Sequence, residues 1–323
     1  MTSSRRVFVR LAAGAPLAAL ALGAPARAQT LETLRVLSFP SDAIKQVLYP
    51  IQAGIFRNLG VQIDIESMGS GSAIMTALIG GAGDFGSGSI FSVFPAFGHG
   101  IPLQIVAPIA VYDTDHCDYW LTVRTDADIQ QARDLNGKVL GCDSPSDISV
   151  VATRVWMDRN GGDGKSLRAL PINGSEVLPA FLQGRIDAAT QRPPFLTVAM
   201  QSGRVRAFAK PLDVVAPRFL LSCWVASNDY IAKNPANVKA YVTGLTTAAR
   251  YINHHQDDTV AMVAQFTKQD PAQVRAGVRT VIAENITLAD VQKPLDFAFK
   301  YGMMDKQYDA RVMLSKFMPM APQ

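Results

Sequence analysis

The stretch FPSD, residues 39–42, recurs as SPSD at residues 144–147, 105 positions later, and this repeated corner decides the fold. An apolar run comes shortly before each copy, LRVLS before the first and KVLGC before the second. Each copy precedes a segment with apolar residues at helical spacing. An apolar run, a turn and an amphipathic segment are typical of a strand that leads into a helix. The sequence therefore predicts the same strand-to-helix corner twice.

The repeat extends beyond the corner. With the chain shifted by 103 residues, Asp84 falls on Asp187 and Gly100 on Gly203, and ALIGGAGDFGSGS (77–89) aligns with AFLQGRIDAATQR (180–192). Both stretches read as a helix end with glycine, a turn, an aspartate and a short strand. Internal similarity in matching order indicates two structurally related units.

Strands and helices alternate through both units. Strands are expected at 34–37, 61–65, 84–86, 103–108, 138–142, 167–172, 186–189, 205–209 and 219–227, and helices at 44–51, 73–79, 90–97, 148–160, 176–183 and 194–201. This alternation predicts an α/β protein whose mainly parallel sheets are covered by helices on both faces. Only helices are expected after residue 227, and they should pack on the first unit because the second is already complete.

The first 28 residues have the features of an export signal. Ser4-Arg5-Arg6-Val7-Phe8 is a twin-arginine pattern, residues 11–22 are uncharged and rich in alanine and leucine, and Ala26-Arg27-Ala28 is a small-x-small cleavage site. This order predicts a secretory signal peptide of the twin-arginine type, removed before Gln29. An apolar stretch of twelve residues is too short to span a bilayer as an anchor.

Removal of this segment changes the charge of the chain. The formal net charge of +4 comes entirely from the four arginines of the signal segment, which contains no acidic residue. The mature chain is then formally neutral, so its charge gives no support to a nucleic-acid or anionic-membrane surface. The remaining 295 residues are more than one hydrophobic core usually organises, which predicts two domains.

Motifs for catalysis and metal binding are incomplete. GDGKS (162–166) lacks the first glycine of a phosphate-binding loop, because Arg159 stands there, and it follows a helix where the motif needs a strand. Neither copy of GSGS completes a nucleophile elbow. The cluster YDTDHCDYW (112–120) has no standard metal-ligand spacing. The sequence therefore predicts no enzyme, no cofactor and no metal site, and leaves open whether Cys117, Cys142 or Cys223 form a disulfide.

Both repeated corners lie where an open α/β sheet binds ligands, at the carboxyl ends of strands. Backbone N–H groups and hydroxyls at a helix start favour an anion there. Two lobes whose corners face each other would enclose such a ligand. The alternative for Ser41, Asp42, Ser146 and Asp147 is helix capping, and one cap is expected at each corner.

Five stretches resemble the periplasmic substrate-binding proteins of ABC importers, in the branch that takes up sulfonates, taurine, nitrate and thiamine-pyrimidine precursors. They are AGIFRNLGVQIDI (53–65), ALIGGAGDFGSGS (77–89), DLNGKVLGCDSPSD (134–147), AFLQGRIDAAT (180–190) and ASNDYIAKNPANVKAYV (226–242). The resemblance implies a type II periplasmic binding protein: two lobes, two crossover strands near 120–124 and 219–227, and a central cleft. Lobe one would comprise 29–122 and 220–323, and lobe two 123–219.

The resemblance also implies the function and the site. A periplasmic monomer would capture a small anionic or zwitterionic molecule and deliver it to a membrane permease and its ATPase. Trp224, on the second crossover, could stack on the ligand or could equally be a core residue. Carried over by position, the other ligand contacts fall on Ser38, Phe39, Ser41, Ser70, Ser72, Ser87, Ser89, Ser144, Ser146, Gln191 and Arg192.

Arg192 follows the predicted strand 186–189 and precedes Pro193-Pro194. A guanidinium held at a strand end suits a carboxylate or sulfonate bound through two hydrogen bonds. The alternative is a salt bridge to an acid on the lobe surface.

Two other functions share this fold. One is a thiamine-pyrimidine synthase that uses bound pyridoxal phosphate, but that enzyme has a cysteine cluster that is not found here, and an export signal argues against a cytosolic biosynthetic role. The other is a periplasmic sensor module. Neighbouring genes for a permease and ATPase would favour import, and a kinase or regulator would favour sensing.

Overall fold

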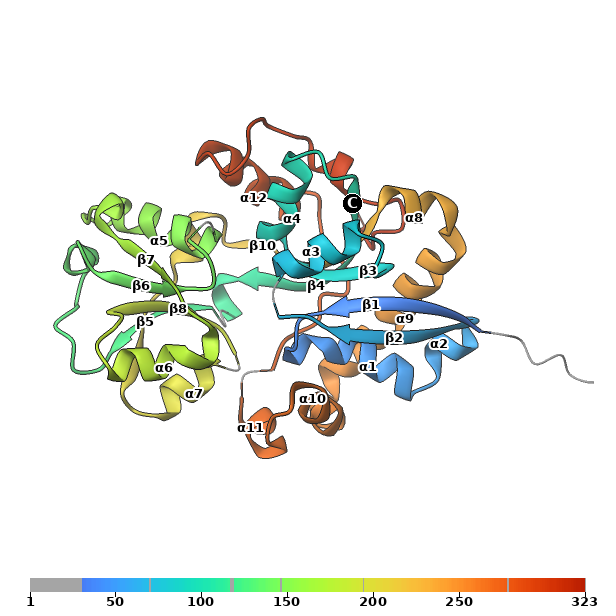
Figure 1. Cartoon of the computed structure of the whole chain (residues 1–323), viewed down its shortest axis with the longest axis horizontal. Coiled ribbons are helices and arrows are strands. Elements are labelled where there is room, and N and C mark those ends of the chain that lie inside the picture. Colours follow the sequence, from blue (N-terminus) through green and yellow to red (C-terminus); the bar gives the residue numbers. More distant parts are fainter. Residues whose placement is uncertain are drawn as a thin grey trace, which may run out of the picture. The chain divides into compact units, whose positions relative to one another are not determined.

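The computed structural model describes residues 31–69, 71–116, 119–145, 147–193, 195–277 and 279–322, without the side chains of Ser72 and Phe91 (Figure 1). The predicted signal peptide, residues 1–28, lies outside the described residues. Contacts group Leu31–Gln323 into one compact unit. No helix within the described ranges is both long and apolar enough to cross a membrane.

Lobe one is built on a five-stranded sheet with the order β2-β1-β3-β10-β4, and we call it sheet A. Its strands are β1 (Glu32–Ser38), β2 (Val61–Ser67), β3 (Phe85–Ser89), β4 (Leu103–Asp113) and β10 (Arg218–Ser227). β1 is parallel to β2 and β3, whereas β10 is antiparallel to both its neighbours. The connecting helices are α1 (Lys45–Gln52), α2 (Ile55–Asn58), α3 (Gly71–Ile79) and α4 (Ile90–Gly98).

Lobe two is built on a second five-stranded sheet, sheet B, with the order β7-β6-β8-β5-β9. Its strands are β5 (Trp120–Arg124), β6 (Val139–Cys142), β7 (Arg168–Pro171), β8 (Ala188–Gln191) and β9 (Val205–Ala209). Here β5 is the antiparallel strand. The helices are α5 (Ile148–Arg159), α6 (Gly174–Leu182) and α7 (Phe195–Gln201).

The strand register confirms the predicted repeat. Val36 of β1 pairs with Phe85 of β3 in sheet A, and Leu140 of β6 pairs with Ala188 of β8 in sheet B. These pairs are related by nearly the same shift along the chain that aligned the two sequence copies. Each lobe therefore has the same order of four parallel strands, with one antiparallel strand inserted between the third and the fourth.

The C-terminal region is helical and packs on lobe one, as predicted. It contains α8 (Asn228–Lys233), α9 (Pro235–His254), α10 (Val260–Thr267), α11 (Pro271–Ala276) and α12 (Ala289–Lys300). Val238, Tyr241 and Leu245 of α9 join a core cluster with Val36 of β1. Leu295 of α12 joins the cluster that contains Phe94 of α4.

The chain crosses between the sheets twice, from β4 to β5 and from β9 to β10, and the two crossings are bonded to each other. The Thr114 N–H donates to the Pro217 carbonyl at 2.9 Å, and Lys210 Nζ donates to the Thr114 carbonyl at 2.7 Å. β5 begins at Trp120, two residues before the predicted boundary at 122, and β10 begins at Arg218, one residue before the predicted boundary at 219. The boundaries at 122 and 219 stay a prediction.

Candidate functional site

The parallel strands of each sheet end at the predicted corners. In lobe one, β1 ends at Ser38 and β3 at Ser89; in lobe two, β6 ends at Cys142 and β8 at Gln191. Carboxyl ends of parallel strands are the ligand-binding edge of an open α/β sheet. These four ends define the candidate site.

In lobe one, two serines hold the corner that follows β1. The Phe39 N–H donates to Ser87 Oγ at 3.2 Å, and Ser87 Oγ lies 3.3 Å from Ser38 Oγ. Ser38 and Ser87 are both buried. Their hydroxyls therefore position Phe39, which is only partly buried.

Phe39 and Arg192 bring predicted site residues of the two lobes together. The Arg192 guanidinium carbon lies 5.9 Å from the centroid of the Phe39 ring. At this distance the cation is attracted to the ring face. The first predicted corner and the end of β8 are therefore neighbours, although more than 150 residues separate them in the sequence.

Gln191, next to Arg192, is a buried amide at the end of β8. It is 4% exposed, and its amide lies 2.8 Å from Thr122 Oγ1. The Thr122 hydroxyl has a single proton and also lies 3.0 Å from the Ala189 carbonyl. When that proton goes to the carbonyl, the Gln191 amide can turn so that its NH₂ group donates to Thr122 Oγ1. The end of β8 therefore combines the Arg192 guanidinium with a buried amide that Thr122 holds in place.

The second corner caps α5, as predicted. Asp147 is the N-cap residue, and its Oδ1 accepts from the Ser149 N–H at 2.7 Å. Burial raises the pKa of Asp147, while its hydrogen bonds to Ser149 and the positive charge of Arg192 act in the opposite direction. The positive charge of Arg192 thus acts on Asp147 of the second corner and on the Phe39 ring of the first.

The capping prediction is wrong at the first corner. Ser41 stands at the N-cap of the 3₁₀ turn η1 (Asp42–Ile44), and its side chain makes no capping bond. Asp42 instead bonds to Lys45 Nζ at 2.6 Å, Arg279 Nε at 2.7 Å and the Thr280 N–H at 2.7 Å. Charged donors form stronger hydrogen bonds to a carboxylate than backbone N–H groups do. The Asp42 carboxylate is therefore held by Lys45 and Arg279 and does not cap the helix.

Trp224 is a core residue and not a ligand-stacking one, which corrects the ligand assignment considered from the sequence. It is 1% exposed, and its Nε1 donates to Gln46 Oε1 at 2.9 Å. The Tyr241 ring lies edge-on at 5.7 Å. Neighbouring side chains therefore cover the indole, and we leave it out of the proposed site.

The structure shows the contacts of only some of the remaining predicted serines. Ser70 and Ser146 lie outside the described residues, and Ser72 lies in the first turn of α3. The Ser89 carbonyl accepts from Ser92 Oγ at 2.8 Å, and the Ser144 carbonyl accepts from the Asp147 N–H at 3.0 Å. Ser89 is the last residue of β3 and Ser144 lies two residues after the end of β6, and the ligand role of both stays a prediction.

Three hydroxyl residues behind the site were missed from the sequence. Thr190 Oγ1 donates to Ser149 Oγ at 3.1 Å, and Thr122 Oγ1 holds the Gln191 amide. For two of them the sequence position was an available signal: Thr190 directly precedes Gln191, and Ser149 lies two residues after the second corner.

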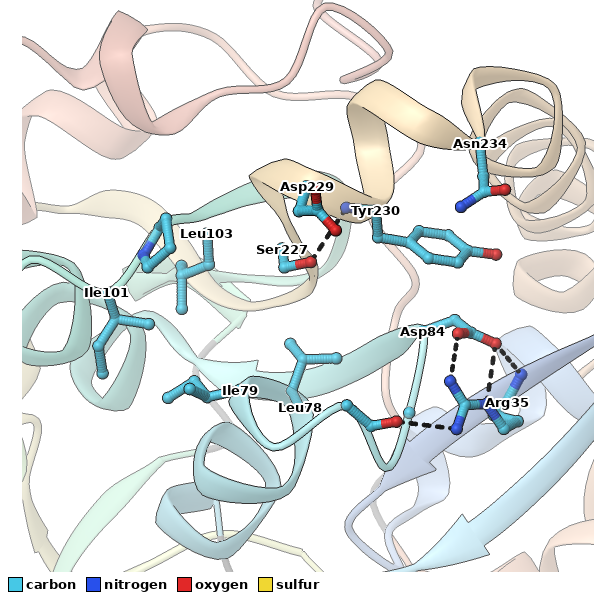
Figure 2. Close-up of a pocket in the computed structure, with 13 residues that line it drawn as sticks. Arg35, Leu78, Ile79, Asp84, Ile101, Leu103, Ser227, Asp229, Tyr230 and Asn234 are labelled. Carbon is cyan, nitrogen blue, oxygen red and sulfur yellow. Dashed lines mark hydrogen bonds and ion pairs between the residues drawn. The ribbon is translucent and has the colours of Figure 1, made fainter.

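A separate cavity of about 330 Å³ lies at the opposite, amino edge of sheet A (Figure 2). It opens where β3 and β10 stop pairing at Gly86 and Val225, and Ile79, Leu103 and Tyr230 contribute to its walls. Its charged groups are already paired: Arg35 binds Asp84 and the Gly81 carbonyl, and Asp229 binds Lys233 at 2.9 Å. It offers a ligand no unpaired charge among its described lining residues, so we do not place the site there.

The described thiols are unsuited to nucleophilic chemistry. Cys142 and Cys223 are buried and free. Burial raises the pKa of the Cys142 thiol to about 11 and that of Cys223 still further. Cys117 lies outside the described residues, and within the part that is described no group of His, Cys, Asp and Glu could hold a metal ion.

Comparison with known proteins identifies the family. Residues 44–259 match the model of the family described as NMT1/THI5 like. A Brucella abortus protein named in general terms as a binding protein is 24% identical over 227 residues, which cover 69% of this chain and 67% of that protein.

Two solved structures show the same fold. The periplasmic aliphatic sulphonate-binding protein SsuA from Escherichia coli has a TM-score of 0.72 and 17% identity, covering 90% of this chain and 94% of that one. The periplasmic nitrate-binding protein NrtA from Synechocystis has a TM-score of 0.72 and 10% identity, covering 90% and 86%. The chain therefore belongs to the NMT1/THI5-like family and has the two-lobed fold of periplasmic substrate-binding proteins.

Proposed function

We propose that this protein binds a small anionic or zwitterionic organic molecule at the carboxyl ends of its strands. One observation carries the proposal: the Arg192 guanidinium, directly after the end of β8, lies 5.9 Å from the ring of Phe39, directly after the end of β1. A carboxylate or sulfonate would bind this guanidinium through two charge-assisted hydrogen bonds. Phe39 supplies the facing apolar surface from lobe one.

The wider role that we infer is solute capture for import. The predicted signal peptide would take the protein to the periplasm, where it would act as a monomer and pass its ligand to an ABC permease and its ATPase. The family match and the fold support a binding role. The raised pKa of the Cys142 thiol makes this side chain a poor nucleophile, because the thiolate form is the one that reacts.

A ligand screen tests this function. Thermal shift should find compounds that raise the unfolding midpoint among sulfonates, small carboxylates, amino acids, pyrimidines and aromatic acids, because a ligand that binds only the folded state stabilises it. Calorimetry should then show stoichiometric binding, and mass spectrometry should recover the compound chemically unchanged. Selective binding of cations, or conversion of the compound to a product, would contradict the proposal.

A further inference from the structure

A buried polar cluster is centred on Asp42, the last residue of the first corner. The side chain of Lys45, at the start of α1, is fully buried, and its Nζ donates to Asp42 Oδ2 at 2.6 Å and also to Gln256 Oε1. Gln256 belongs to the 3₁₀ turn η6 (Gln256–Thr259). A buried lysine needs such partners, because removing an ammonium group from water is costly.

Arg279 is the second cation on the same carboxylate. Its Nε donates to Asp42 Oδ1 at 2.7 Å, and its other nitrogens donate to the Gln256 carbonyl at 3.1 Å and to Thr259 Oγ1 at 2.7 Å. Only 11% of the Arg279 side chain is exposed. Three segments that are distant in the sequence therefore meet at Asp42, three residues after Phe39.

The charges in this cluster do not balance. Among the residues that the structure describes, one carboxylate, Asp42, faces two cations, Lys45 and Arg279. The two acids of η6 bond elsewhere, Asp257 to Arg275 at 3.6 Å and Asp258 to the Tyr251 hydroxyl at 2.6 Å. The cluster therefore has an excess of one positive charge whenever Lys45 is protonated.

We propose that Asp42, Lys45 and Arg279 form a positioning unit for the Phe39 corner, and that an anion bound beside Phe39 compensates the excess positive charge of this unit. The location of the anion rests on the proposed function, whereas the unit itself does not. Lys45 and Arg279 would supply the positive potential of lobe one, as Arg192 does for lobe two. Protonation of Lys45 and binding of an anion then favour each other.

The direction of the pH effect follows from Lys45. Burial lowers its pKa from 10.5 to about 8; the charge of Arg279 acts in the same direction and Asp42 opposes it. The unfolded chain therefore binds more protons than the folded one between pH 8 and 10.5, so the free energy of unfolding should rise with pH across this window. An anion near the cluster should raise the pKa of Lys45, and its affinity should fall as pH rises above 8.

Ligand-free NMR tests the unit. In wild type carrying [13Cε]lysine, one lysine should titrate with a midpoint near pH 8, and the Phe39 and Ser41 amide shifts should follow the same midpoint. Lys45→Met should abolish the lysine titration near pH 8 and the matching amide shifts of Phe39 and Ser41. Lys239→Met, at an exposed site on α9, should leave the titration and the amide shifts unchanged. If every lysine of the wild type titrates near 10.5, or the Phe39 amide stays flat through pH 8, the proposal is wrong. The wild-type titration decides this even if Lys45→Met does not fold.

A binding measurement with methanesulfonate tests the coupling. Wild-type affinity should fall about three- to tenfold between about pH 7 and 9.5, as expected for one charge acting on a nearby anion, and should stay nearly constant in Lys45→Met. Equal pH dependence in both proteins overturns the coupling. Failure of methanesulfonate to bind at any pH counts against the proposed ligand class, while the NMR result on the unit still stands.

Discussion

Asp84 and Asp187 occupy equivalent places in the two lobes and make the same pair of backbone contacts. Asp84 Oδ2 accepts from the Arg35 N–H at 2.8 Å, and the Asp84 N–H donates to the Arg35 carbonyl at 2.8 Å. Asp187 makes both contacts with Val139, each at 2.9 Å. Asp84 thus joins the turn before β3 to β1, and Asp187 joins the turn before β8 to β6, the neighbouring strand of its own sheet.

The two aspartates should differ in their contribution to stability. Asp84 also binds the Arg35 guanidinium at 2.8 Å, whereas Asp187 lies 3.8 Å from Lys138 and is more exposed. Asp84→Ala should lower the free energy of unfolding by about 1.5–3 kcal/mol and Asp187→Ala by about 1 kcal/mol. Urea unfolding measures both, with exposed Asp229→Ala as a control expected within about 0.5 kcal/mol of wild type. Equal losses at the two sites would contradict this ranking.

Arg192 should matter for binding far more than for folding. Arg192→Ala should weaken binding of the best compound from the ligand screen by about 2–5 kcal/mol, as for loss of one partner of a charged pair. Arg192→Lys keeps the charge but loses the fork geometry, so its affinity should lie between that of wild type and that of Arg192→Ala. Without ligand, stability should change by about 1 kcal/mol or less. Exposed Arg185→Ala is the control, and calorimetry showing Arg192→Ala within about twofold of wild type removes Arg192 from the site.

Trp224 should show the opposite behaviour. Trp224→Phe removes the donor to Gln46 Oε1 and leaves that buried acceptor unsatisfied, so the free energy of unfolding should fall by about 1–3 kcal/mol. Ligand affinity should not change, because Tyr241 and Gln46 already occupy the surroundings of the indole. Trp156→Phe, in a partly buried site on α5, is the matched comparison. A loss of affinity in Trp224→Phe at unchanged stability would restore Trp224 to the site.

The buried thiols should be inert in the native protein. Because the pKa of Cys142 is raised to about 11, roughly one thiol in a thousand is ionised at about pH 8. Iodoacetamide at this pH should leave Cys142 and Cys223 unmodified, and both should react after unfolding in urea. Peptide mapping by mass spectrometry reads this directly. Rapid native labelling of Cys142 would show that the end of β6 opens to solvent.

The exported protein should begin at Gln29. Signal peptidase cleavage after Ala26-Arg27-Ala28 removes all four arginines of the leader. Intact-mass analysis of periplasmic material checks this, and replacing Arg5 and Arg6 by lysine should retain the precursor if export uses the twin-arginine route. A periplasmic species that still contains Arg5 would contradict the prediction.

Most of the strand order could be predicted, because it depends on local signals. Apolar runs bounded by turns marked the strands, and the repeat showed that both lobes would share one topology. The ends of β1, β3, β6 and β8 follow from that topology. Phe39 and Arg192 could therefore be placed at one edge without knowledge of any contact between them.

The errors arose where the answer depends on distant partners. Arg279 lies 237 residues from Asp42, so nothing near the first corner indicates that Asp42 forms an ion pair and not a cap. Cys223 and Trp224 are adjacent and both buried, because β10 is covered on both faces. In such a strand, alternation of apolar and polar residues cannot show which side chain faces the ligand edge.

The position of β10 in sheet A has a consequence for synthesis on the ribosome. All five strands of sheet B lie between Trp120 and Ala209, so their pairing partners emerge together. Sheet A, however, needs Arg218–Ser227 between β3 and β4 before either strand has its partner on that side. The lobe that is begun first can therefore be completed only after the other has been translated, and until then the facing edges of β3 and β4 lack their hydrogen-bonding strand.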